Sequence, residues 1–570
     1  MEFFHRQLAG GTALPELSML AIIVGVLTAT VVLLFRGAIE AAAWLTGRPD
    51  AETFEALGIT WHLLLPIAGA VVVGLMLTRS PPDSRRFGVV HVMERLARHR
   101  GRLPWRGAVH QFVGGVIGLA TGFSGGREGP AVHLGAATSS LLGQVLRLPD
   151  NCVRTLVACG SAAAIGASFN TPMAGVIFAM EVVMMEYAIT SFVPIIIATV
   201  TATLLSRWFV GDVIEFPIPH TEMGSLVEVP YIMVAGVVVG LLAGTFTYLV
   251  SVFAKLGSMP FWAQATLAGA ITGLAALAAP EVLGVGYDTV NAALLGNFAW
   301  TTLLAILVAK FVASAACVGV GLPVGVIGPT LVLGALLGGL IGIAGHVLIP
   351  EHASTPALYV MLGMAAMMAA VLQAPLAALV AVLELTASPR VILPAMLIIA
   401  IATLTTSLFK RRSALLTTLA TLGVRYPPHA AAQHLLRVGV AGLMDREFVL
   451  TTEPTDNEFR DSLDPMPRWI VVDDPGDARS VVDARDLEHR DDPPGATADI
   501  VERLRLAERY QAGDIDVRAT LQEALTELNR FGVDTLCVTR SRSAWRSNGD
   551  SRRTVVGVLT REDIESQAWW

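Results

Sequence analysis

The sequence predicts an all-α polytopic membrane domain followed by a small α/β domain, and two features of composition lead to this prediction. Hydrophobic residues make up 54% of the 570-residue chain and charged residues only 15%, with a mean hydropathy of +0.61. That balance is too apolar for a soluble chain of this length, so the bilayer is the expected solvent. Charged residues become dense after about residue 430. We therefore expect a transmembrane domain over residues 1–425, a linker over 426–440 and a soluble domain over 441–570.

Apolar stretches recur through the first part of the chain. They cover about residues 18–38, 62–78, 107–121, 173–207, 229–255, 262–279, 302–348, 358–384 and 391–409. Several are long enough to cross the hydrocarbon core as helices. The shorter, glycine-punctuated stretches predict half-helices and re-entrant segments, which are tolerated where protein rather than lipid surrounds them. The first residues lack the basic start and cleavage site of a signal peptide, so we expect the first apolar segment to be retained.

The distribution of basic residues predicts the orientation in the membrane. Arginine and lysine crowd two loops, residues 79–106 and 410–412. Because cytoplasmic loops of membrane proteins carry an excess of these residues, both loops and the C-terminal domain are expected in the cytoplasm. We expect a multi-pass protein of the inner or plasma membrane of a bacterium.

Composition also limits the classes of cofactor and partner. The four cysteines lie far apart, without the spacing of a metal knuckle or a disulfide framework, and we interpret them as buried small residues: Cys152, Cys159, Cys317 and Cys537. The net charge of −7 is spread along the chain and gives no indication of nucleic acid binding. We therefore expect neither a metal site nor a nucleic acid partner.

An internal repeat points to a functional site. GREGPAVHLGA and GVIGPTLVLGA align without gaps at an offset of 199 residues, which places Gly126 on Gly325. NTPMAGVIFAME and QAPLAALVAVLE align at an offset of 203, which places Glu181 on Glu384. Small residues abound in membrane helices, so either match alone is weak. Two matches in the same order at nearly the same offset indicate a duplicated architecture.

Each half carries a Gly-Pro pair that opens an apolar run. Proline is favoured at the start of a helix, because its missing N–H would have no intrahelical partner there. The glycine-rich approach leaves neighbouring N–H groups uncovered, and the helix dipole adds partial positive charge. Broken helices in corresponding places of two halves indicate a transport site near the membrane midplane. We therefore predict an anion site, with tight helix-packing turns as the alternative.

Glu128 lies inside the first of these turns, between Gly126 and Pro130. An ionised carboxylate there can occupy the positive pocket and compete with a permeating anion, whereas a protonated one can swing away. Because a carboxylate inside the membrane is energetically costly, its presence suggests a functional site. The alternative is an acid that only stabilises the helix start through the dipole.

These motifs carry a resemblance to a known family. SGGREGPAVHLGA is similar to the second signature, G(K/R)EGP, of the CLC family of chloride channels and anion/proton exchangers, and FNTPMAGVIFAME resembles the helix that follows it. GVIGP lies where the family has GxFxP, with Ile327 in place of phenylalanine. The likeness runs over most of residues 60–425.

The resemblance implies a fold and a set of site residues. The fold is a homodimer of independently conducting subunits, each an antiparallel duplication of membrane helices with broken segments. Glu128 then corresponds to the external gating glutamate. The groups that help to bind the anion lie around the two turns, at Gly126, Arg127, Gly129, Val326 and Ile327. The implied substrate is chloride or another small inorganic anion.

The departures from the family pattern concern side chains of the pathway. Phe87, in RFGVV, replaces the serine of GSGIP, and Leu415 falls where the family has its pore tyrosine. Without these hydroxyls the site relies on backbone N–H groups, which select less sharply among anions. Chloride, nitrate, bicarbonate and fluoride all stay open as the physiological anion.

A third departure concerns protons. Val182 occupies the position of the glutamate that passes protons inward in many family exchangers. We therefore expect uncoupled or loosely proton-coupled anion transport, in a channel or an exchanger. The neighbouring Glu181 either takes over the proton path or, like Glu384, has a structural role at a helix end. A stoichiometric anion/proton antiporter is the first alternative.

Residues 441–570 contain two strand-and-helix patterns that look like a CBS pair, a domain that commonly accompanies CLC membrane domains. In the second pattern Gly557, Thr560 and Asp563 fit the family's way of holding a ribose and phosphates, whereas the first pattern ends in VVDARDL and lacks the glycine and threonine. An adenine nucleotide is therefore the one cofactor that the sequence suggests. Asp563 can equally cap the terminal helix.

Other classes of function fit the sequence less well. A cation transporter needs hard oxygen ligands that converge in the membrane, and the membrane region has too few carboxylates. No nucleophile, base and orienting group occur together at a recognisable spacing, so we do not expect an enzyme. A transport-dead sensor, with Phe87 closing the pathway, is the remaining alternative.

Overall fold

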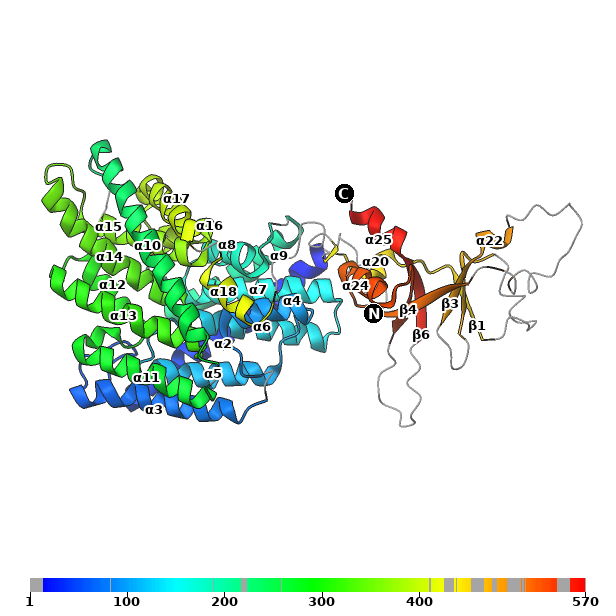
Figure 1. The fold of residues 1–570 in the computed structure, drawn as a ribbon, viewed down its shortest axis with the longest axis horizontal. Coiled ribbons are helices and arrows are strands. Elements are labelled where there is room, and N and C mark those ends of the chain that lie inside the picture. Colours follow the sequence, from blue (N-terminus) through cyan, green and yellow to red (C-terminus); the bar gives the residue numbers. More distant parts are fainter. Residues whose placement is uncertain are drawn as a thin grey trace, which may run out of the picture. The chain divides into compact units, whose positions relative to one another are not determined.

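The structure is a computed structural model, shown as a ribbon in Figure 1. It describes residues 14–81, 84–187, 189–216, 223–257, 259–409, 412–424, 435–436, 438–452, 466–473, 479–488, 504, 507, 509–540 and 554–568. The chain divides into two compact units. The larger comprises Leu17–Leu146 and Val153–Pro427, and the smaller comprises Met1–Glu16, Arg147–Cys152 and Pro428–Trp570.

The first 424 residues are helical wherever regular structure is described. The α-helices are α2 (Leu14–Leu45), α3 (Ile59–Thr78), α4 (Gly88–Arg98), α5 (Trp105–Ala120), α6 (Glu128–Val145), α7 (Asp150–Phe169), α8 (Pro172–Phe178), α9 (Ile189–Val210), α10 (Val229–Ala254), α11 (Phe261–Ala278), α12 (Tyr287–Leu294), α13 (Trp300–Val320), α14 (Ile327–Leu348), α15 (Pro356–Leu372), α16 (Pro375–Thr386), α17 (Ile392–Phe409) and α18 (Ala414–Thr421). A π-helical turn, Ala179–Met184, continues α8, and single 3-10 turns precede α10 and α17 and follow α11.

Nine helical segments among the described residues are long and apolar enough to cross a membrane. They are the segments that contain α2, α3, α7, α9, α10, α11, α13, α14 and α17. Helices of this length and composition span the hydrocarbon core. The predicted all-α polytopic membrane domain is confirmed.

The breaks in this fold do not fall where the apolar stretches suggested. The stretch 173–207 divides at Met185, which has a left-handed φ of 53°, and the stretch 302–348 divides after Gly321, with φ 82°. Backbone conformation ends these helices, so hydropathy alone does not reveal the breaks. Conversely, α7 is a helix in a part of the chain where we expected no apolar stretch. Its mean hydropathy is the modest 1.4 of a helix surrounded by protein, with 94% of its apolar window buried.

Small residues allow the helices of the second half to pack closely. α14 and α15 approach at Gly334 and Gly363, where a Cβ on Gly334 would overlap the carbonyl of Gly363, and one on Gly338 would overlap the carbonyl of Tyr359. Interfaces of this kind bring backbones into van der Waals contact without a hydrophobic driving force. This packing holds α14 closely against α15.

The smaller unit contains one six-stranded sheet in the order β1-β2-β3-β4-β5-β6. The strands are β1 (Phe448–Thr451), β2 (Trp469–Val472), β3 (Ser480–Asp483), β4 (Tyr510–Asp516), β5 (Thr535–Arg540) and β6 (Thr554–Thr560), with helices α20 (Val440–Leu443), α22 (Arg485–Glu488), α24 (Leu521–Phe531) and α25 (Arg561–Ala568). β1 pairs with β2, and β4 with β5, in parallel; the other pairs are antiparallel. The predicted α/β character of this region is confirmed.

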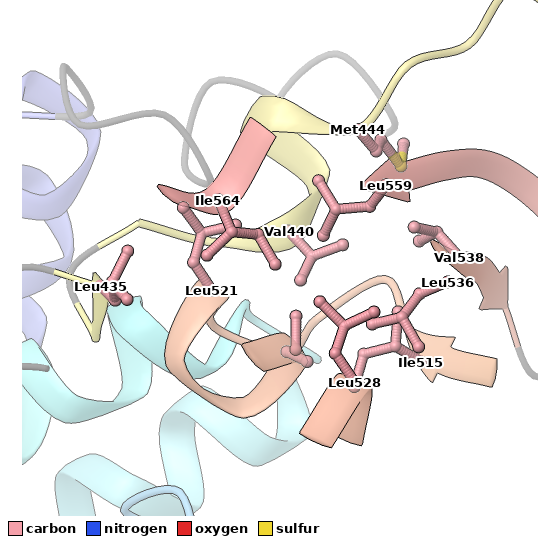
Figure 2. Close-up of a cluster of buried hydrophobic side chains, with 12 residues drawn as sticks. Leu435, Val440, Met444, Ile515, Leu521, Leu528, Leu536, Val538, Leu559 and Ile564 are labelled. Carbon is pink, nitrogen blue, oxygen red and sulfur yellow. The ribbon is translucent and has the colours of Figure 1, made fainter. Parts of the chain in front are cut away.

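Side chains from helices and strands meet in one core of this unit (Figure 2). Leu521 and Leu528 of α24 pack with Leu536 of β5, Leu559 of β6 and Ile564 of α25, all of them buried. A capping box, Thr520 with Glu523, fixes the start of α24. In the neighbouring cluster, burial raises the pKa of the Cys537 thiol to about 12, so this thiol stays protonated at neutral pH.

Candidate anion site and gate

The two turns of the repeat lie directly against each other. The N–H of Gly126 donates to the carbonyl oxygen of Gly325 at 2.8 Å, and the N–H of Gly325 donates to that of Gly126 at 2.7 Å. A Cβ on Gly325 would be 2.5 Å from the nitrogen of Gly129, so glycine is required for this approach. The starts of α6 and α14, 199 residues apart in sequence, therefore face one site.

The helices begin earlier than the Gly-Pro pairs suggested. α6 starts at Glu128 and α14 at Ile327, so Pro130 and Pro329 are the third residues of their helices rather than the first. None of the first N–H groups of a helix has an intrahelical acceptor, which makes proline acceptable throughout the first turn. One consequence is that Glu128 and Ile327 belong to the helix starts themselves.

The carboxylate of Glu128 connects the two turns. The side chain is fully buried. Its Oε2 accepts a hydrogen bond from the N–H of Gly328, at 3.1 Å, in the first turn of α14. Its Oε1 accepts a hydrogen bond from the hydroxyl of Tyr287. A carboxylate oxygen therefore occupies one of the backbone donors that an anion would use at this helix start.

Tyr287 is a site residue that sequence reasoning missed. It begins α12, and its buried ring packs against Phe169 and Phe216, with ring centroids 6.1 and 5.4 Å apart. Its backbone N–H donates to the carboxylate of Glu52 at 2.8 Å. The only local signal is the pair of glycines before it in GVGYDTV, Gly284 and Gly286, both with positive φ. Nothing in sequence links this tyrosine to a glutamate 159 residues away.

Arg127 is held on the same side of Glu128 as these aromatic rings. Its guanidinium forms an ion pair with Glu215, with 2.9 Å between Nη2 and Oε1. It also lies over the rings of Phe169 and Tyr287, 5.5 and 5.4 Å from their centroids. The arginine thus places a positive charge close to the Glu128 carboxylate. The faces of the two rings attract the guanidinium and help to hold it there.

A cavity of about 310 Å³ lies along both turns, and we call it the Phe87 cavity. Its wall is formed by residues 85–91, Gly129, Ala254, Phe261, residues 318–322 and 324–327, Ala414, Leu415, Thr418, Thr421 and Leu422. The structure therefore brings Phe87, Gly129, Val326, Ile327 and Leu415 to one space. A liquid water molecule takes up roughly 30 Å³, so the cavity has room for a small anion together with water.

The charges near this cavity come from arginines. Arg85 and Arg86 both contribute to the wall. Arg86 forms an ion pair with Glu94, a buried acid, whereas the guanidinium of Arg85 donates to the carbonyls of Ser80 and Thr78. Arg85 therefore leaves its positive charge without a carboxylate among these contacts, a distribution that favours anions over cations in the cavity.

Glu181 and Glu384 cap each other's half of the repeat. Glu181 accepts hydrogen bonds from the N–H groups of Leu376 and Ala377, at 3.3 and 2.7 Å, at the start of α16. Glu384 accepts hydrogen bonds at the start of α8 from Met173, at 3.0 Å, and Ala174, at 2.8 Å. This reciprocity supports the structural interpretation of both acids, because each carboxylate stabilises a helix N-terminus. Val182, beside Glu181, is a buried apolar residue.

The three residues named for nucleotide binding make contacts within the smaller unit. The Thr560 hydroxyl donates to Asp563 Oδ2 at 2.6 Å, and the N–H of Asp563 lies 3.2 Å from the same hydroxyl oxygen. Gly557 lies where β6 meets residues 444–445, and a Cβ there would be 2.7 Å from the carbonyl of Asp445. The Thr560 and Asp563 contacts cap α25, which is the structural alternative for Asp563, and Gly557 allows a close backbone approach.

Comparison with known proteins gives a consistent set of relatives. The family model described as voltage gated chloride channel matches residues 69–407. A ClcB-like protein of Ralstonia nicotianae that carries a chloride-channel name is 36% identical over 364 residues, 62% of this chain and 85% of the relative. The H(+)/Cl(-) exchange transporter ClcA of Salmonella agona is 30% identical over 392 residues, 66% of this chain and 82% of the relative.

A solved structure extends the likeness beyond the membrane region. The crystal structure of a eukaryotic CLC transporter has a TM-score of 0.60, with 18% identity, over 97% of this chain and 98% of the transporter. At this identity the match concerns the fold alone. It includes the smaller unit as well as the helices.

Proposed function

Since the chain belongs to the voltage gated chloride channel (CLC) family, we propose that it carries small inorganic anions across a membrane through a pathway that Glu128 opens and closes. One observation carries this proposal: the buried carboxylate of Glu128 accepts the N–H of Gly328 at the facing helix start. The named relatives are a chloride-channel protein and an exchange transporter.

The proposed gate is a competition for the helix-start donors. In the ionised state, Glu128 holds the N–H of Gly328 and the Tyr287 hydroxyl, so an arriving anion finds these donors occupied. Protonation removes the charge that the helix dipoles and Arg127 attract. The neutral side chain then gives up these donors, and the anion takes its place. Acid should therefore promote anion flux.

The Tyr287 hydroxyl should set how much acid is needed to open this gate. Tyr287→Phe removes a donor to the ionised carboxylate, so Glu128 should take up a proton more readily, and flux should rise at a higher pH than in the wild type. A hydrogen bond to a charged group is worth about 1.5–3 kcal/mol, which is about one to two pH units in the midpoint. Anion efflux from liposomes as a function of pH measures this midpoint.

A matched control exists for this substitution. Tyr231 also donates its hydroxyl inside the membrane unit, to the carbonyl of Ile341, and it bonds no carboxylate in that contact. Tyr231→Phe should leave the midpoint where it is. Equal midpoints for wild type and Tyr287→Phe would contradict the role given to Tyr287.

We further propose that transport is uncoupled, or only loosely coupled, to protons. A proton path needs an acceptor within hydrogen-bond reach, directly or through water. Val182 offers none, Leu415 brings no hydroxyl to the Phe87 cavity, and Glu181 is engaged with the start of α16. ClcA is named as an exchanger and 30% identical, so stoichiometric exchange is the second candidate.

A transport-dead sensor is less well supported. If Phe87 closed the pathway, its side chain would pack against the two turns and leave no free volume there. Instead Phe87 borders a cavity of about 310 Å³ that reaches Gly129 and Ile327. We therefore propose that anions enter this cavity on their way to Glu128. Purified protein in liposomes, tested with chloride, nitrate, bicarbonate and fluoride while proton movement is recorded, would separate transport from sensing and identify the preferred anion.

The remaining parts of the proposal concern assembly and location. We propose a homodimer of CLC-type subunits in a bacterial inner membrane, with the segment 79–106, which contains α4 rather than only a loop, and the C-terminal unit on the cytoplasmic side. The excess of arginine in that segment supports the orientation. Accessibility of a cysteine introduced at the exposed Glu562, from either side of intact cells, tests it.

We propose that the smaller unit is a CBS pair that binds adenine nucleotides weakly. A ribose hydroxyl would have to displace the bond between Thr560 and Asp563, which already satisfies both side chains. We expect ATP to bind the full-length protein with a Kd of about 1 mM or weaker, equivalent to about 4 kcal/mol or less. Titration calorimetry measures this value, with Asp563→Ala as the variant. Tight binding that survives the substitution would place the nucleotide in another pocket.

A further inference from the structure

A series of hydrogen-bonded, buried polar side chains adjoins the Phe87 cavity, and one of its members, His91, is itself a lining residue. Gln111 of α5, His133 of α6 and His91 of α4 are almost fully buried. Gln111 Oε1 lies 3.0 Å from His133 Nδ1, and His133 Nε2 lies 3.2 Å from His91 Nδ1. At the far end, Arg95 donates its Nε–H to His91 Nε2 at 3.1 Å. The family resemblance assigned no role to any of these residues.

The backbone fixes the orientation of the Gln111 amide. Its Oε1 accepts the N–H of Gly88, at 2.9 Å, and its Nε2 donates to the carbonyl of Pro323, at 3.2 Å. A flipped amide would place two donors together at Gly88 and two acceptors together at Pro323. Because each buried polar group needs a partner, only the observed orientation satisfies both backbone groups.

This orientation determines the proton positions on both histidines. Gln111 Oε1 is an acceptor, so His133 Nδ1 carries the proton and His133 Nε2 accepts from His91 Nδ1. His91 Nε2 is then the acceptor for Arg95. Every hydrogen bond of the series is made when both histidines are neutral. Burial first, and then the charges of His133 and Arg95, lower the pKa of His91 well below its usual value, so these hydrogen-bonded side chains form a fixed, neutral support.

These hydrogen-bonded side chains fix the positions of two parts of the cavity wall relative to each other. Gly88 is the first residue of α4 and lines the cavity, while Pro323 directly precedes the lining residues Val324–Ile327. Gln111 is absent from the described residues that line the cavity. Its helix also supports the second segment, because a Cβ on Gly114 would be 3.0 Å from the Pro323 ring. Gln111 therefore acts on the cavity only through its backbone partners.

We propose that Gln111 is a positioning residue for the anion pathway, which fixes the start of α4 relative to the turn before α14, with His133 and His91 holding its amide in place. This inference rests on the proposed function, since it assumes that anions pass through the Phe87 cavity. Both segments line the cavity, and the first N–H groups of α4 and α14 have no acceptor within their own helices. Their separation sets which anion fits between them, so Gln111 governs affinity and selectivity without touching the anion.

The test compares substitutions that break the support with one that restores it. Gln111→Met keeps the length of the side chain but loses both backbone partners. We expect it to raise the chloride concentration at half-maximal flux about fivefold, the size expected for one lost hydrogen bond, and to change the nitrate-to-chloride flux ratio. His133→Leu should do the same to a smaller extent. His133→Gln can donate to Gln111 and accept from His91, so it should behave as wild type.

A buried serine of α6, the helix that carries His133, serves as the matched control. Ser140 of α6 bonds the backbone of Gly101 and Leu103, away from the cavity wall, and Ser140→Ala should leave both readouts unchanged even if less protein folds. If Gln111→Met does not fold, the difference between His133→Leu and His133→Gln decides. The inference would be overturned if the wild type carries anions and if Gln111→Met and His133→Leu keep the affinity and selectivity of the wild type. Absence of flux in the wild type would instead overturn the proposed function.

Discussion

Glu128→Gln should abolish the pH dependence of anion flux and leave the pathway open at neutral and basic pH. Glutamine has the shape of the protonated acid and carries no charge, so the helix starts and Arg127 no longer hold it against an arriving anion. A single titrating group changes occupancy about tenfold per pH unit away from its midpoint. The wild-type flux should therefore fall steeply toward high pH, whereas the flux of the variant should stay level. Efflux from liposomes over a series of buffers measures both curves.

Glu228 offers a matched control for this prediction. It is also a fully buried glutamate that accepts a tyrosine hydroxyl, from Tyr359, but its other partner is Ser354 rather than a helix start of the repeat. Glu228→Gln should keep the wild-type pH profile even if the protein becomes less stable. A folded, active Glu128→Gln protein with the wild-type profile would remove Glu128 from the gate.

The reversal potential under opposed anion and proton gradients should follow the anion gradient alone. A fixed exchange ratio requires a proton to reach Glu128 from the other side, and Val182 and Leu415 provide no acceptor for it. For a strictly coupled exchanger the reversal potential shifts with the pH gradient as well as the anion gradient. The expected shift with pH is close to zero. Flux through purified protein in liposomes, clamped with an ionophore, gives this potential.

If the reversal potential also follows the proton gradient, a Glu181 variant tests where the proton passes. A reversal potential that follows both gradients at a constant ratio would show coupled exchange. Glu181→Gln would then reveal whether the acid beside Val182 carries the proton. Glu384→Gln is the matched control, because it removes the equivalent cap from the other half of the repeat. Loss of coupling in Glu181→Gln alone would assign the proton path to Glu181, whereas equal effects would reflect lost capping.

Much of the site was visible in the sequence because it belongs to a local motif. Both glycine-rich turns and the acid at position 128 could be recognised from residues that lie next to each other, and the repeat from the alignment of such short motifs. The position of each helix start was less well predicted. Proline fits anywhere in the first turn, so the Gly-Pro pairs did not reveal that α6 begins at Glu128 and α14 at Ile327.

Composition determined that this protein is a helical membrane protein with an α/β domain after it, because residues that face lipid must be apolar along a whole segment. The glycine-rich motifs, through their resemblance to a known family, indicated the CLC type. Only the tertiary structure decided which side chains surround Glu128 and the cavity. Tyr287 reaches the gate from α12, and Gln111 bonds both Gly88 and Pro323, the second of which lies 212 residues further along the sequence. Such contacts depend on single polar atoms brought together by folding, and a single hydrogen bond produces no periodicity or spacing in the chain.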